Sequence, residues 1–202
     1  SFIASEEFVM RRRVVVTGIG CVTPVGNDVE TMWKALLRGD TGIGRTTIFD
    51  ASNFPTKISA EVKGFDLASV GEDPEKWKYQ ARHTRFAVGA AKQAVRDSGP
   101  RRMPIDPTRF GVYLGSGEGP QDFDRFTKMM LAAMPAGEGF DVAKFTQVGL
   151  EVLHPIAELE QEPNMPAGHM AALFNAQGPN VNCLTACAAS SQAVGEAVEM
   201  IR

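Results

Sequence analysis

A cysteine near the end of the chain lies where a strand pattern meets a helix pattern. Val181, Cys183 and Thr185 alternate with Asn182 and Leu184, which is consistent with a strand. After Cys187 the apolar residues recur at the spacing of one helix face, namely Val194, Ala197, Val198 and Ile201. Small residues surround the junction, so the sequence predicts a sharp strand-to-helix turn with Cys187 at the start of the helix.

That position would suit a nucleophile. The positive end of a helix dipole favours a thiolate, and the unpaired N–H groups of the first turn can donate to a developing oxyanion. Most free cysteines, however, are small buried apolar residues, so the pattern alone leaves a structural role for Cys187 open. Cys21 and Cys183 lie at no such junction, and we predict that both are core or near-core residues.

The composition indicates an ordinary globular protein. Of its 202 residues 44% are hydrophobic and 22% are charged, which gives no sign of disorder. The net charge of −3 argues against nucleic-acid binding, which needs a basic excess on one face. No apolar run approaches the roughly 20 residues of a membrane-spanning helix, so we predict no membrane insertion.

The start of the chain and its cysteine content bear on processing and location. Residues 1–12 have acidic residues where a signal peptide has basic ones, and we interpret them as an N-terminal extension or a remnant of cloning. The three cysteines fit neither an even disulfide framework nor metal-ligand spacing. A reducing cytoplasm and the absence of a metal site are therefore the expectations.

Strand patterns alternate with helix patterns along the chain, which predicts an α/β fold with a largely parallel sheet. Asp28 or Asn27 can cap a helix that ends at Gly39, and residues 80–99 form a long amphipathic helix. Strands are expected at residues 14–19, 56–64, 109–115 and 180–185, and residues 121–162 have an interrupted helical composition. The glycines after residues 17 and 114 match no complete nucleotide-binding motif, so tight turns are the better interpretation.

Several motifs together resemble one family, the elongating β-ketoacyl-acyl-carrier-protein synthases. These motifs are "VVVTGIGCVTPVGN" near the start, "RFAVGAAKQAVRDSG", "RFGVYLGSG", "NMPAGHMA" and "TACAAS" around Cys187, and they occur in the expected order. The resemblance covers residues 13–202 and is poorer between residues 119 and 162. Thiolases and initiating synthases have their cysteine nearer the N-terminus, and the polyketide synthases usually carry "DTACSS".

The resemblance implies a thiolase-like, layered α/β/α fold built from two similar halves, of which residues 13–202 are the N-terminal one, and usually a homodimer. It implies an acyltransferase of fatty acid synthesis in which Cys187 accepts an acyl group from acyl carrier protein. Decarboxylative Claisen condensation with a malonyl-carrier thioester then gives a 3-oxoacyl product. No metal or organic cofactor is implied, and the N–H of Cys187 would form half of the oxyanion hole.

Further site residues follow from the same resemblance. Glu118 stands where the family usually has an apolar residue near the acyl pocket, so we expect it to alter acyl-chain preference, and Thr185 is a candidate substrate-binding residue beside the cysteine. Three basic residues lie opposite the apolar face of the 80–99 helix and are candidates for docking an acidic carrier protein: Lys78, Arg82 and Arg85. A solvated charged face is the alternative for these three.

The family's two catalytic histidines and its lysine belong to the second half of the fold. His83, His154 and His169 have helical contexts, and we predict that they are surface or core-edge residues. Residues 1–202 alone are therefore expected not to catalyse condensation, and to aggregate unless paired. The alternatives are a polyketide-type ketosynthase, a thiolase-like enzyme of coenzyme A thioesters, and a non-catalytic dimer partner. A cysteine at position 187 argues against the last.

Overall fold

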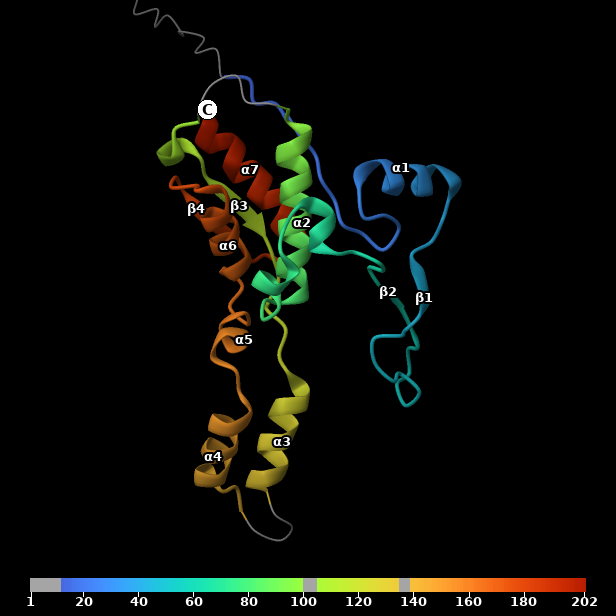
Figure 1. Ribbon diagram of the computed structural model, residues 1–202, viewed down its shortest axis with the longest axis vertical. Coiled ribbons are helices and arrows are strands. Elements are labelled where there is room, and N and C mark those ends of the chain that lie inside the picture. Colours follow the sequence, from blue (N-terminus) through green and yellow to red (C-terminus); the bar gives the residue numbers. More distant parts are fainter. Residues whose placement is uncertain (1–11, 100–104, 135–138) are drawn as a thin grey trace, which may run out of the picture.

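The computed structural model describes residues 12–99, 105–134 and 139–202 (Figure 1). Helices and strands alternate along much of the chain, as the sequence predicts. In chain order they are α1 (Val29–Arg38), β1 (Ile43–Arg45), β2 (Ile58–Ala60), α2 (Arg82–Asp97), β3 (Val112–Gly115), α3 (Phe123–Ala133), α4 (Val142–Val152), α5 (Pro155–Leu159), α6 (Met165–Phe174), β4 (Asn180–Cys183) and α7 (Ala189–Ile201). Short 3₁₀ helices are η1 (Leu67–Val70), η2 (Pro74–Trp77), η3 (Pro107–Arg109) and η4 (Ala186–Ala188).

The centre of the molecule is the parallel pair of β3 and β4, on which α6 and α7 pack (Figure 1). The register pairs Val112 with Asn180 at one end and Gly115 with Cys183 at the other. Because parallel strands run the same way, their carboxyl ends lie at one edge of the pair. The loop after β3 and the turn after β4 therefore begin side by side.

Two arms extend from this centre in Figure 1. One contains α1 and the antiparallel hairpin of β1 and β2, and the other is the pair α3 and α4. The rings of Phe126 and Phe140 both contact Phe145 of α4, at centroid distances of 6.4 and 5.4 Å. Many of the large apolar side chains of α3 and α4 remain exposed.

Helix α2 joins the centre to the buried cluster of Leu67, Val70, Trp77 and Val88. The apolar face that the sequence predicts on this helix lines a hollow of about 640 Å³ together with residues of β3 and α6. That face consists of Ala87, Ala90, Ala91, Ala94 and Val95. The ends of α1 are also as expected, since Asp28 accepts a hydrogen bond from the Thr31 amide and Gly39 adopts φ 74°.

The strand expected at residues 14–19 is not formed. Residues 12–22 run along α2 without strand pairing, and Val15 and Val16 are 64% and 79% exposed. The amide of Ile19 donates to Asp97 instead, at 2.9 Å. A strand needs a neighbouring backbone for its hydrogen bonds, and the described residues supply none here. For the same reason the expected parallel sheet is limited, in the described part of the chain, to β3 and β4.

Gly115 lies at the tightest contact between the strand pair and α7. A Cβ at this position would be 2.2 Å from the nitrogen of Ser190 and 2.3 Å from the carbonyl carbon of Ala189. Both atoms belong to backbone, so a side chain here would have to displace the first turn of α7. Gly195, farther along α7, has open space around its Cβ direction.

We predict that Gly115→Ala destabilises the fold, because overpacking against backbone typically costs about 1–3 kcal/mol. The matched control is Gly195→Ala, which replaces a glycine within α7 and should leave stability unchanged or raise it by up to about 1 kcal/mol. Urea unfolding of the two variants measures the difference. Equal midpoints for Gly115→Ala and the wild type would show that α7 does not depend on this contact.

Candidate functional site

Cys187 is exposed in the middle of η4, directly before α7. The amides of Ala188 and Ala189 donate to the carbonyl oxygens of Thr185 and Ala186, which closes the turn. The N–H groups of Ala186 and Cys187 precede these donors and have no acceptor within the turn. The sharp strand-to-helix turn that the sequence predicts is thus present, with the thiol at the surface.

Ala186 has φ 46°, in the left-handed region that residues with a Cβ seldom adopt. Such a conformation costs about 1–2 kcal/mol for an L-residue. The strain is located immediately before Cys187 and reverses the chain direction between β4 and α7. Thr185 supports the same turn from outside, since its hydroxyl donates to Gln192 Oε1 of α7 at 2.9 Å. Its side chain is therefore engaged in the turn.

The edge beside Cys187 contains a residue that sequence analysis did not identify, Ser116. Its amide donates to the Cys183 carbonyl at 3.1 Å and so continues the ladder of β3 and β4 by one residue. Its hydroxyl lies 2.9 Å from both the Pro163 carbonyl oxygen and Asn182 Oδ1. The glycines on either side of Ser116, directly after a predicted strand, were the only signal in the sequence.

Glu118 lies in the loop that follows β3, and its side chain is exposed. It comes three residues after Gly115, whereas Cys187 comes four residues after Cys183, the register partner of Gly115. Both residues therefore belong to segments that leave the same edge of the strand pair. The effect of Glu118 on an acyl pocket stays a prediction.

The other two cysteines differ from Cys187 in exposure. Cys183 is buried in β4, as predicted, with 5% of its surface exposed. Cys21 is partly buried, and burial raises the pKa of its thiol, with a further contribution from the negative charge of Asp28. A raised pKa lowers the thiolate fraction at neutral pH, and the thiolate is the reactive form.

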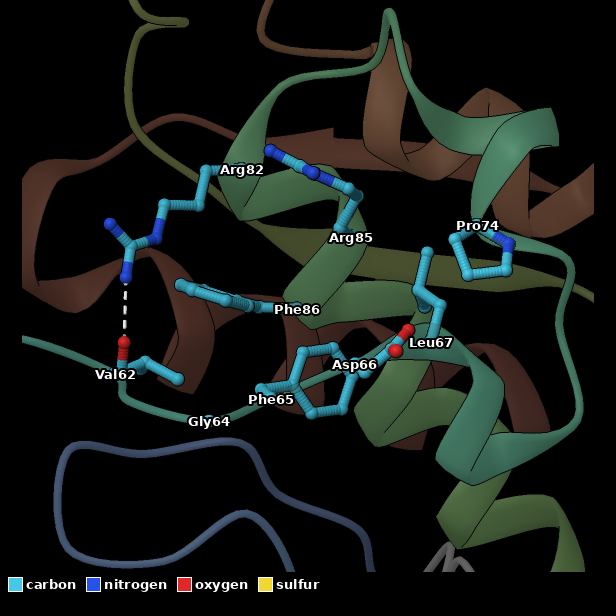
Figure 2. Close-up of a pocket in the computed structure, with 9 residues that line it drawn as sticks. All are labelled: Val62, Gly64, Phe65, Asp66, Leu67, Pro74, Arg82, Arg85 and Phe86. Carbon is cyan, nitrogen blue, oxygen red and sulfur yellow. Dashed lines mark hydrogen bonds between the residues drawn. The ribbon is translucent and has the colours of Figure 1, made fainter.

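Figure 2 shows where the predicted basic residues lie. Arg82 and Arg85 line a pocket of about 360 Å³ whose other walls include Phe65 and Phe86. Arg82 donates through Nη2 to the Val62 carbonyl oxygen at 2.7 Å. The structure thus brings two of the three basic residues together.

Lys78, the third of them, does not line this pocket. It precedes α2 and forms an exposed ion pair with Glu75 at 3.2 Å. The expected cluster therefore consists of Arg82 and Arg85, because α2 begins only at residue 82 and Lys78 does not share its face.

Each of the three histidines either contacts a neighbouring side chain or is partly buried. His169 Nε2 lies 2.6 Å from Glu160 Oε1, and the ring of His154 stacks on Tyr79 at 4.1 Å. His83 is partly buried, and burial lowers its pKa, an effect that the Glu160 carboxylate partly opposes. These surroundings match the structural roles predicted for them.

Within the ranges that the structure describes, no group of three or more histidine, cysteine, aspartate or glutamate side chains is placed to hold a metal ion. In the same ranges, none of the helices has both the length and the apolar character that crossing a membrane requires.

Comparisons with a family model and with curated proteins identify the same family. The sequence model described as "Beta-ketoacyl synthase, N-terminal domain" matches residues 11–202. Similar curated proteins include the 3-oxoacyl-[acyl-carrier-protein] synthases 2 of Coxiella burnetii, 37% identical over 191 residues, and of Vibrio harveyi, 35% identical over 191 residues. Each alignment covers 95% of this chain and 42% of the relative, so the chain spans less than half the length of these proteins.

Solved structures share the fold. A β-ketoacyl synthase from Burkholderia phymatum superposes with a TM-score of 0.70 at 27% identity, over 94% of this chain and 43% of that one. A type II polyketide ketosynthase in complex with its acyl carrier protein also gives a TM-score of 0.70, at 22% identity, over 95% of this chain and 48% of that one. These neighbours are thiolase-like ketosynthases, which confirms the predicted α/β fold class.

The exposure of the three thiols predicts the order in which they react. Iodoacetamide at near-stoichiometric dose should alkylate Cys187 well before Cys21, whose pKa is raised, and Cys183, which is buried. Peptide mass spectrometry over a time course measures the order. Equal labelling of the three cysteines would contradict the assignment of Cys187 as the accessible thiol of the site.

Proposed function

We propose that this chain, which belongs to the β-ketoacyl synthase family as its N-terminal domain, supplies the nucleophile of a condensing enzyme of fatty acid synthesis. The observation that carries the proposal is the exposed Cys187 on a strained turn, with its own amide left without a partner inside that turn. The curated relatives that are 3-oxoacyl-[acyl-carrier-protein] synthases support the reaction type.

In the first step the Cys187 thiolate attacks the thioester carbonyl of an acyl-carrier substrate. The carbonyl oxygen becomes an oxyanion to which the N–H of Cys187 donates, and the intermediate collapses as the carrier sulfur leaves as a thiolate. Cys187 then holds the acyl group as a thioester. The exposed position of the thiol leaves room for a substrate carried by another protein.

In the second step a malonyl-carrier thioester loses carbon dioxide, and the electron pair of the broken bond forms an enolate. The enolate carbon attacks the acyl carbonyl on Cys187, the sulfur leaves as thiolate, and a 3-oxoacyl-carrier thioester is released. In the family that this chain resembles, the donors to the enolate oxygen are two histidines of the second half of the fold. His83, His154 and His169 have the local surroundings described above and are not assigned this role.

A polyketide-type ketosynthase is the second candidate function. The fold is similar to that of the ishigamide ketosynthase/chain length factor, with a TM-score of 0.69 at 24% identity over 95% of this chain and 44% of that one. This similarity is the observation that supports the second candidate. The identities to curated 3-oxoacyl synthases are higher, which is why we place fatty acid synthesis first. Cys187 argues against a purely non-catalytic partner, because such a chain does not need an exposed thiol at this turn.

An acidic acyl carrier protein is the proposed partner. The pocket of Arg82 and Arg85 presents two guanidinium groups beside the aromatic rings of Phe65 and Phe86. Guanidinium groups bind carboxylates and phosphates through paired hydrogen bonds, which a carrier surface can supply.

A homodimer is proposed as well. Large apolar side chains on α3 and α4 are strongly exposed, including Phe123 at 70%, Leu131 at 73% and Leu150 at 84%. Large apolar side chains exposed together on two packed helices favour an interaction surface. The three free cysteines fit the reducing cytoplasm that we propose as the location.

The nucleophile is tested by Cys187→Ser in the complete enzyme. The hydroxyl is a far weaker nucleophile without a strong base, so condensation should fall by about 10³-fold or more. Carrier-dependent formation of the 3-oxoacyl product measures the loss, and Cys21→Ser is the matched control that should retain activity. Wild-type rates in Cys187→Ser would refute the proposed function.

The carrier site is tested by reversing its charge. Arg82→Glu with Arg85→Glu should raise the Michaelis constant for the carrier substrate about tenfold at low ionic strength, and less at high salt. Arg85→Glu alone keeps the hydrogen bond from Arg82 to the Val62 carbonyl oxygen. This variant therefore distinguishes the effect of charge from that of a disturbed local structure. Lys34→Glu, on an exposed residue of α1 that does not line the pocket, is the control. An unchanged Michaelis constant at low ionic strength would show that both arginines belong to a solvated surface without a docking role.

A further inference from the structure

Glu160 is a buried acid that the proposed chemistry does not use. It is 2% exposed and follows α5 directly. One carboxylate oxygen accepts from the Ala81 amide at 3.3 Å and from the Thr84 hydroxyl at 3.0 Å, and the other lies 2.6 Å from His169 Nε2. All three partners lie at the N-terminal end of α2 or on α6, so the carboxylate ties the end of α5 to both helices.

The residues that follow Glu160 hold the loop after β3. The Gln161 carbonyl oxygen accepts from the Gly119 amide at 3.1 Å, and the Pro163 carbonyl oxygen is 2.9 Å from the Ser116 hydroxyl. The contact at Gly119 is close, since a Cβ there would lie 2.4 Å from the Gln161 oxygen. Residues 160–163 therefore connect two regions. Glu160 is anchored to α2 and α6, and the following residues are hydrogen-bonded to the loop of residues 116–119.

This loop shares its edge of the strand pair with the turn of Cys187. Gly115 and Cys183 are register partners, and the Ser116 amide continues the ladder to the Cys183 carbonyl. A shift of residues 116–119 would therefore move the surface that an acyl group on Cys187 meets.

We propose that Glu160 is a positioning residue that fixes the loop of residues 116–119 and thereby sets acyl-chain specificity without contacting the acyl group. The inference rests on the proposed function only for its effect on specificity. The mechanical part, that the carboxylate restrains Gly119 through residues 160–161, holds for the chain whatever it catalyses.

A second, partly buried acid provides a matched control. Glu72 also lies against α2, where it forms an ion pair with Lys92 at 2.7 Å and accepts from Trp77 Nε1 at 3.2 Å. Its side chain is 9% exposed. None of the contacts described for Glu72 reaches residues 116–119. A general loosening of α2 would follow from changing either acid, whereas loss of loop positioning would follow from Glu160 alone.

The first test measures hydrogen exchange in the complete enzyme carrying Glu160→Ala or Glu72→Ala. We expect exchange at the Gly119 amide to accelerate at least tenfold in Glu160→Ala and to stay at the wild-type rate in Glu72→Ala. Glu160→Gln keeps an acceptor for Ala81 and Thr84 and should restore slow exchange. Thr84→Val, which removes one donor and preserves shape, provides the milder variant if Glu160→Ala does not fold, and it should accelerate exchange to a smaller degree.

The second test measures specificity on the same proteins. Glu160→Ala should change the ratio of kcat/KM between short and long acyl-carrier substrates at least fivefold, while iodoacetamide still alkylates Cys187 at the wild-type rate. Unchanged exchange at Gly119 in both Glu160→Ala and Thr84→Val, or an equal response in Glu72→Ala, would overturn the positioning role. Altered exchange with an unchanged acyl ratio would overturn the specificity role. A wild-type enzyme that forms no acyl-Cys187 would instead refute the proposed function and leave the exchange result standing.

Discussion

The parallel pairing of β3 with β4 is the constraint on which the rest of the site depends. The register runs from Val112 with Asn180 to Gly115 with Cys183, so the residues that follow Gly115 and Cys183 lie at the same edge of the pair. The absence of a side chain at Gly115 lets the first turn of α7 lie directly against β3. Because α7 begins immediately after η4, this single close contact also determines where Cys187 stands relative to the loop that follows β3.

The turn that presents Cys187 combines strain with unpaired amides. The left-handed conformation of Ala186 lets the chain pass from strand to helix without a loop, and it leaves the Cys187 amide ahead of the first donor of the turn. A longer connection would avoid the strain, but it would separate the thiol from the helix start. The left-handed conformation of Ala186 thus causes both the local strain and the position of the amide proposed to donate to the oxyanion.

Much of this arrangement was predictable because it depends on residues close together in sequence. The alternation before Cys187 and the helical spacing after it predicted the junction, and Asp28 with Gly39 predicted both ends of α1. The apolar face of α2 followed from its spacing in the same way. The matching motifs also identified the family that the comparisons then showed for residues 11–202.

The sequence by itself determined the local geometry of the candidate nucleophile, since a turn, a cap or a helix face is decided by a few neighbouring residues. Only the tertiary structure decided which distant groups meet. Ala81 and Thr84 stand 79 and 76 residues from Glu160, and no short-range pattern relates them to that carboxylate. Residues 14–19 show the same limit, because their strand-like pattern needs a neighbouring backbone that the described chain does not place beside them.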